Sequence, residues 1–143
     1  MSVANVHCVI NPKNGPTYKG QMLDELINGI LDFEKENNLR FDAFIMHDSE
    51  DLIDPSSLLL YRQNLSNYDF IQTPVLSFNR ESLNFVGGTY LDEFAEIHSK
   101  DLLVRQATKA AIPSAGVGTC MKRNLVLYFR DLQEGALFPH KDL

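Results

Sequence analysis

Two carboxylates stand close together after an apolar stretch near the middle of this 143-residue chain. Asp48 and Glu50 follow the apolar residues 41–46 and are separated by a single residue. In an extended segment the side chains of residues i and i+2 point the same way, so both carboxylates can face one point. Mg²⁺ and Mn²⁺ prefer hard oxygen ligands, and water and diphosphate oxygens commonly complete their coordination. The spacing therefore indicates a divalent metal site at Asp48 and Glu50.

The same segment has a simpler, structural interpretation. Acidic residues are common where a strand gives way to a helix, and Asp54 followed by Pro55 is typical of a helix N-cap with proline at the first helical position. Asp51 can be a solvated carboxylate, and His47 can be a structural histidine whose hydrogen bonds are satisfied. On spacing alone both interpretations remain open, because short acidic motifs often match by accident.

Three further residues have types and positions that suit a phosphate or a sugar. Lys19 follows a Gly/Pro turn near the start of an expected helix and could reach a phosphate, although a solvated lysine is equally ordinary there. Gly116 and Gly118 would let a substrate approach the backbone closely. Glycines in a connecting loop often serve only to adopt unusual φ angles, so this second interpretation also stays open.

Other chemistries find little support in the residues. The acidic segment 92–101 lacks the Glu-x-x-His spacing of a helical metal site, and His98 falls on an apolar helix face, where a packed histidine is the more common case. Neither a Gly-x-Ser-x-Gly nucleophile motif nor a dinucleotide fingerprint is present. The net charge is −6 without a run of Lys or Arg, which argues against a nucleic-acid partner.

The elements that must position these residues alternate between strands and helices. This alternation predicts an α/β fold with a mostly parallel sheet flanked by helices, and a single domain over residues 1–143. In such sheets ligands collect beyond the carboxyl ends of the strands, where the acidic segment lies. We expect strands at 6–10, 41–46, 68–75 and 119–122, and helices at 19–36, from Pro55, from Thr89 (with Asp92 in a capping box, after a break at Gly87–Gly88) and at 124–132.

The cysteine content and hydropathy bear on the cellular compartment. Cys8 and Cys120 have no zinc-ligand spacing, so we predict that both are reduced, buried thiols in a cytosolic protein. Each window falls short of the ~20 apolar residues that a membrane helix requires. We therefore expect no membrane segment in this chain, although it could be one piece of a membrane protein.

The acidic segment also resembles a known family motif. The sequence HDSEDLIDP at 47–55 is similar to the metal-binding motif of family 2 glycosyltransferases, in the form found in inner-membrane proteins of the phage-adsorption type. Four ordered blocks are more specific than one acidic triplet. The three further blocks are 15–20 with Leu23 and Asp24, 72–75 followed by 88–96, and 114–123.

This resemblance implies a GT-A fold and inverting transfer of a sugar from a nucleotide-diphosphate donor to an acceptor hydroxyl, and UDP is the nucleotide that it leads us to expect. It assigns Asp48 and Glu50 to Mg²⁺ or Mn²⁺, Lys19 to the neighbourhood of the nucleotide diphosphate, and Gly116 and Gly118 to an acceptor-side loop. The catalytic base of the family is not identifiable in these residues. The expected location is the cytoplasm, on the cytoplasmic face of the inner membrane for a membrane-bound parent.

Several family features are absent from the chain. Gly20 and Asp24 replace the usual Ala and Asn, and the Thr-Glu-Asp and Gln-x-x-Arg-Trp segments are missing. The first strands of the family fold should precede residue 6. We therefore expect a fragment, natural or engineered, that is inactive alone and whose open sheet edge can pair with another copy. The alternative hypothesis is a glycosyltransferase-like binding or scaffold module of a membrane assembly that has lost catalysis.

Overall fold

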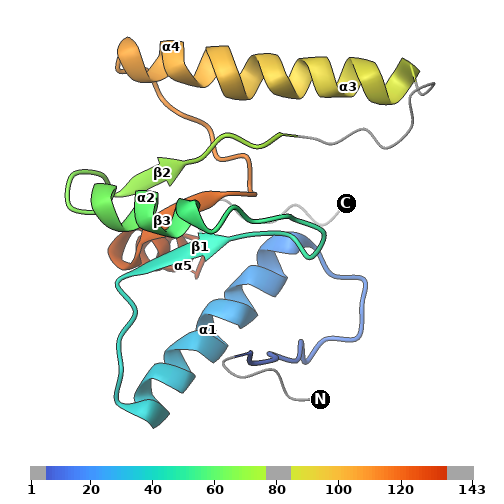
Figure 1. The fold of residues 1–143 in the computed structure, drawn as a ribbon. Helices are drawn as coiled ribbons and strands as arrows, with labels where there is room; N and C mark the ends of the chain where they lie inside the picture. Colours follow the sequence, from blue (N-terminus) through green and yellow to red (C-terminus); the bar gives the residue numbers. More distant parts are fainter. Residues whose placement is uncertain (1–5, 77–84, 135–143) are drawn as a thin grey trace. The chain divides into compact units, whose positions relative to one another are not determined.

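The computed structural model describes residues 6–76 and 85–134 (Figure 1). The chain divides into two compact units, residues 1–42 with 129–143 and residues 43–128. Each unit is considered by itself below. The first is called the helical unit and the second the sheet unit.

The sheet unit contains three strands within the part of the chain that the structure describes. They are β1 (Ala43–Met46), β2 (Phe70–Gln72) and β3 (Thr119–Lys122), in the order β1-β3-β2. Both pairings are antiparallel, so the predicted mostly parallel sheet is wrong, although the α/β class is confirmed. β1 and β2 do run in the same direction, joined by a helix, but β3 enters between them in the opposite sense and separates them.

Helices accompany this sheet. α2 (Ser56–Asn64) connects β1 to β2. Three consecutive helical segments then form the long rod drawn in yellow and orange in Figure 1. These segments are α3 (Phe85–Glu96), the π-helical turn η1 (Ile97–Asp101) and α4 (Leu102–Ala107). The division between the two units falls inside α5 (Arg123–Glu134), which follows β3 directly.

The start of α2 follows the sequence prediction. The Asp54 carboxylate accepts hydrogen bonds from the backbone N–H of Ser56 (2.8 Å) and from the Ser56 hydroxyl (2.8 Å). These bonds lower the pKa of Asp54, because they favour its charged form. Pro55 already has helical backbone angles (φ −55°, ψ −28°), so Asp54 stands immediately before the helical backbone, in the N-cap position, and Pro55 is the first helical residue. The predicted role of Asp54 is confirmed.

The predicted start of the next helix is wrong. α3 begins at Phe85 and runs through Gly87 and Gly88, so these glycines do not break the chain. Thr89 and Asp92 consequently lie inside the helix and cannot form a capping box at its start. A glycine costs a helix interior only about 1 kcal/mol, so the pair weakens this helix without ending it.

The centre of the sheet unit is buried around β3. Cys120 and Thr119 are fully buried, and the other buried side chains of this unit include Tyr61 of α2, His98 of η1, Leu102 of α4 and Val126 of α5. Burial raises the pKa of the Cys120 thiol, which keeps it protonated. The prediction of a buried thiol at position 120 is therefore confirmed.

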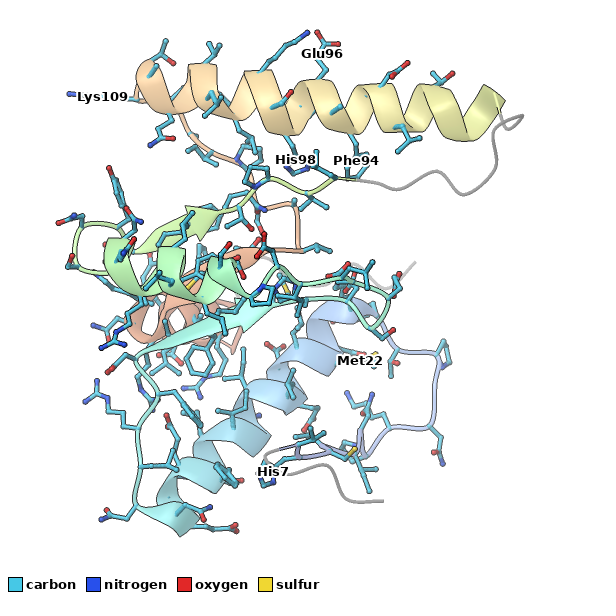
Figure 2. All side chains as sticks on the ribbon, viewed as in Figure 1. His7, Met22, Phe94, Glu96, His98 and Lys109 are labelled. Atoms are coloured by element: carbon cyan, nitrogen blue, oxygen red, sulfur yellow. The ribbon has the colours of Figure 1, made fainter. Side chains whose placement is uncertain are left out.

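The helical unit is built on α1 (Lys19–Asn37), close to its predicted bounds. Residues 6–10, which the structure describes, take no strand conformation and are exposed, Cys8 among them. The predicted strand and the buried thiol at Cys8 are both wrong, because a short apolar run becomes a strand only beside a partner strand. The segment instead contacts α1, because the rings of His7 and Phe33 lie 4.3 Å apart. Figure 2 shows His7 beside this helix.

A buried carboxylate closes the end of α1. Asn38 ends the helix in the left-handed conformation at φ 50°, as helix C-caps commonly do. Glu34 is buried, and its Oε1 accepts the backbone N–H of Phe41 at 2.6 Å. The carboxylate therefore holds the chain that leaves the helix.

In residues 6–76 and 85–134, every helix is too short or too polar for a bilayer crossing.

Candidate functional site

Three loops of the sheet unit meet at one end of the sheet. In the ladder, Met46 at the end of β1 and Gln72 at the end of β2 both pair with Thr119 at the start of β3. The antiparallel entry of β3 thus brings the loop before it to the carboxyl ends of the other two strands. Gly118 joins them directly, because its N–H donates to the Met46 carbonyl (2.9 Å) and its carbonyl accepts the N–H of Thr73 (3.0 Å).

The acidic loop after β1 is a turn and not an extended segment. The Asp51 N–H donates to the Asp48 carbonyl (3.2 Å), and the Asp48 N–H donates to Asp51 Oδ2 (2.8 Å). The expectation that alternation along an extended chain aligns Asp48 with Glu50 is therefore wrong. Aspartate side chains readily accept nearby backbone N–H groups and favour such turns.

Asp51 is held inside the loop by a second donor. Its Oδ2 also lies 3.2 Å from Nδ1 of His47, and the two side chains are only 18% and 22% exposed. The interpretation of Asp51 as a solvated carboxylate is wrong, whereas His47 fits the interpretation of a hydrogen-bonded structural histidine. The three-residue spacing of Asp48 and Asp51, typical of a side-chain-closed turn, is the signal that could have revealed this.

Asp48 and Glu50 provide a donor set that fits a divalent cation. Asp48 is half-buried, and Glu50 is exposed at the tip of the turn, where its Oε2 accepts the Ser49 hydroxyl (3.1 Å). Among the described residues, no three His, Cys, Asp or Glu side chains gather into a complete metal site. Mg²⁺ is usually held by one or two carboxylates, with waters and substrate phosphates as the other ligands. A half-buried and an exposed carboxylate meet that requirement in kind and number.

The glycine-rich loop before β3 needs its glycines for backbone reasons. Gly116 and Gly118 both have positive φ, 82° and 63°. A Cβ on Gly118 would lie 2.6 Å from Oγ1 of Thr73. The Gly118 carbonyl accepts three hydrogen bonds, from the Thr73 N–H (3.0 Å), the Thr73 hydroxyl (2.9 Å) and the buried hydroxyl of Tyr61 (3.0 Å). The conformational interpretation of both glycines is confirmed, and their contact with a substrate stays a prediction.

Tyr61 joins α2 to this end of the sheet. Its side chain is 2% exposed, and its hydroxyl also lies 2.9 Å from Oγ1 of Thr73. Burial raises the pKa of the phenol, so the hydroxyl remains a hydrogen-bond donor. Nothing in the local sequence distinguishes Tyr61 from an ordinary helix residue, because its partners are distant along the chain.

Gln72 fixes the glycine-rich loop with one amide group. Its Nε2 donates to the carbonyls of Thr73 (2.9 Å) and Val117 (2.8 Å). Its Oε1 accepts the N–H of Ala115 (2.9 Å) and the hydroxyl of Thr119 (2.7 Å). All four bonding positions of the amide are therefore used, which also fixes its orientation. In the sequence, Gln72 stands out only as the first residue of the family-like block 72–75.

Successive hydrogen bonds in this loop run from one residue to the next, each with a defined donor and acceptor. Because the Thr119 hydroxyl donates to Gln72, it must accept from Ser114, whose Oγ lies 3.1 Å from it. Ser114 in turn accepts the N–H of Gly116 at 3.2 Å. The loop is thus held in one conformation by groups that follow directly from the ends of β2 and β3.

Lys19 belongs to the helical unit, where it is the exposed first residue of α1. Asp48, Glu50, Gly116 and Gly118 all belong to the sheet unit. The structure thus gathers the last four at one sheet end, and the phosphate-binding role of Lys19 stays a prediction.

His98 is a core histidine. It is 5% exposed, and its ring lies on that of Phe94 with 5.5 Å between centroids. Figure 2 shows both side chains on the same side of the long helix. Its Nδ1 has no hydrogen-bond partner among the described residues, and burial lowers its pKa. The prediction of a packed histidine, and not a ligand, agrees with this environment.

The motif segments gathered at the sheet end lie within a stretch that matches a known protein family. A sequence model of the family "Glycosyltransferase like family 2" matches residues 1–142, and the chain belongs to this family. Enzymes of this family transfer a sugar from a nucleotide-sugar donor to an acceptor and generally use a divalent metal ion.

Two curated relatives are similar over nearly the whole chain. The chain is 45% identical, over 97% of its length, to Bacteriophage adsorption protein B of Escherichia coli (strain K12). It is equally similar to Bacteriophage N4 adsorption protein B of Escherichia coli O157:H7. In each case the chain spans 19% of the relative's length. No solved structure matches significantly.

Proposed function

We propose that this chain is the metal-binding part of an enzyme that transfers a sugar, with inversion, from a nucleotide-diphosphate donor to an acceptor hydroxyl. UDP is the proposed nucleotide, and Mg²⁺ or Mn²⁺ the proposed ion. The family membership supports transfer from a nucleotide sugar, and the acidic turn after β1 supports the metal. The donor sugar and the acceptor are left open.

One observation carries this proposal above the others. The acidic turn, the segment after β2 and the glycine-rich loop are far apart in the sequence, yet the ladder and the bonds of Gly118 gather them at one sheet end. All three are segments by which the chain resembles the family. A reaction between two substrates needs donor-side and acceptor-side groups at one place.

The residues have separate proposed roles. Asp48 and Glu50 bind the cation, which when bound stabilises negative charge on the departing diphosphate. Lys19 contributes positive charge near the diphosphate. Gly116 and Gly118 leave two positions of the acceptor-side loop without a side chain, so that the acceptor can approach the backbone there.

The general base that deprotonates the acceptor is not assigned to any residue of this chain. We propose that residues 1–143 form the central part of a longer transferase domain and bind without catalysing transfer. The relatives are several times longer than the chain, which supports this view. A parent attached to the inner membrane with the site facing the cytoplasm is the proposed setting.

The test is a calorimetric titration of the 143-residue chain with Mn²⁺ in the presence of UDP. We expect saturable binding that Asp48→Asn or Glu50→Gln weakens at least about tenfold, since each removes a charged oxygen ligand. Glu93→Gln, which neutralises an exposed carboxylate of α3 in the same unit, is the matched control and should bind normally.

Absence of Mn²⁺ and UDP binding in the folded wild-type chain would contradict this proposal. It would favour the alternative, a glycosyltransferase-like module that retains the fold as a binding or scaffold element. Binding that all three variants retain would likewise exclude Asp48 and Glu50 as the metal ligands.

A further inference from the structure

We infer that Asp51 is a positioning residue of the metal site: it does not bind the cation, but it fixes the backbone of Asp48 so that the Asp48 carboxylate is presented to the cation. This inference rests on the proposed function, because it concerns the same acidic turn. It names a residue whose role neither the sequence motif nor its family resemblance specifies.

The backbone of Asp48 is held in place by Asp51. Asp51 contacts Asp48 twice, through its own N–H to the Asp48 carbonyl (3.2 Å) and through Oδ2 to the Asp48 N–H (2.8 Å). Both polar groups of the Asp48 backbone are therefore bonded to one residue. The direction in which the Asp48 side chain leaves the backbone depends on these two bonds.

The Asp51 carboxylate is itself held by a second neighbour, His47. The same Oδ2 is 3.2 Å from Nδ1 of His47, so one oxygen serves two neighbours, and the side chain is only 18% exposed. A carboxylate oxygen that lies within hydrogen-bond distance of two nitrogens is held in place from both sides. The Asp51 side chain is therefore fixed against the start of the turn, where Asp48 begins.

The three carboxylates of the acidic turn differ in how far they are exposed and in how they are bonded. Glu50 is exposed, Asp48 is half-buried, and Asp51 is the carboxylate most fully committed to protein donors. Residues that hold metal ligands through hydrogen bonds typically change metal affinity by 10–100-fold when they are replaced. Asp51 has the bonding pattern of such a supporting residue.

The experiment compares Asp51→Asn with Asp48→Asn and with Asp54→Asn as the matched control. Asn at position 51 keeps the size and one acceptor but loses the charge. Asp54 lies beyond the turn and caps α2, where Asn is an equally good cap. For each chain we would measure Mn²⁺ affinity in the presence of UDP, UDP affinity without metal, and hydrogen exchange of the Asp48 amide without metal.

We expect Asp51→Asn to weaken Mn²⁺ binding by about 10–100-fold and to speed exchange of the Asp48 amide by a similar factor, with metal-free UDP affinity unchanged. Asp54→Asn should alter none of these. A general loss of folding would also change metal-free UDP binding and exchange outside the turn, which separates it from a local effect.

Normal Mn²⁺ affinity in Asp51→Asn would overturn the inference. So would a loss of binding as complete as that of Asp48→Asn with unchanged Asp48 exchange, because Asp51 would then be a ligand itself. Failure of the wild-type chain to bind Mn²⁺ with UDP would instead overturn the proposed function, and the assignment of Asp51 to a metal site with it. Asp48 exchange would still report on the turn.

Discussion

Individual residues at the sheet end are constrained by backbone geometry before any ligand is considered. Gly118 combines a positive φ with bonds to Met46, Tyr61 and Thr73, and the space beside its Cα is occupied by the Thr73 hydroxyl. Gly88 is the opposite case, since it lies inside α3 and a Cβ there would meet nothing within 4 Å. The two glycines therefore provide a matched pair.

Replacing each of these glycines by alanine should change stability in opposite directions. We expect Gly118→Ala to lower the free energy of unfolding by about 1–3 kcal/mol, because of its φ and the contact with Thr73. Gly88→Ala should raise it by about 0.5–1 kcal/mol, because alanine favours the helix. Urea denaturation would measure both. Equal effects of the two changes would show that Gly118 is not constrained as described.

The residue types of the candidate site could be predicted from sequence better than their geometry. The positions of Asp48 and Glu50 at the end of a strand followed from the apolar residues before them. The turn that contains these two residues could not be predicted from the sequence, because it depends on how the Asp51 side chain bonds to its neighbours. The roles of Tyr61 and Gln72 could not be predicted for a related reason: the bond of Tyr61 to Gly118 spans 57 positions of the chain, and that of Gln72 to Val117 spans 45.

At the scale of elements, the long helix of the sheet unit buries a histidine without a hydrogen-bond partner for its Nδ1 among the described residues. His98 lies where α3 passes into the π-helical turn η1, and burial lowers its pKa below the ordinary value of about 6.5. The folded chain therefore binds the proton less readily than the unfolded chain does.

This difference predicts that stability falls with acidity. As pH drops below about 6.5, the unfolded chain takes up a proton that the folded chain resists, so the free energy of unfolding decreases; above this pH the group has no effect. His98→Gln should remove part of the decrease in stability that sets in below about pH 6.5. Urea denaturation above and below this pH tests it, and an unchanged decrease in the variant would refute it.

Elements with a strong internal signal were predicted well. α1 and α5 carry long helical patterns, and Thr119–Lys122 was predicted with its observed bounds. The strand predicted at residues 6–10 is wrong, because a strand there would need a neighbouring strand, and the local sequence does not show whether one is present. The Gly87–Gly88 break failed because two weak helix formers were given more weight than the helix around them.

Whether β3 runs parallel or antiparallel to its neighbours determines at which end of the sheet the glycine-rich loop lies. A wholly parallel sheet would place the start of β3 at the end opposite to Asp48. Its antiparallel entry puts Gly118 against Met46 instead. The sequence predicted the correct end of the sheet for the acidic turn, but strand sense is a property of long-range pairing and could not be predicted from local patterns.

Binding of a cation at the acidic turn can be measured by nuclear magnetic resonance of the labelled chain with small amounts of Mn²⁺ and UDP. A bound paramagnetic ion broadens signals near it. We expect the amide signals of residues 47–51 and of Gly118 to broaden first, because Gly118 is bonded to the strand end from which the turn begins. Broadening centred on the acidic face of α3, or none at residues 47–51, would contradict binding at the acidic turn.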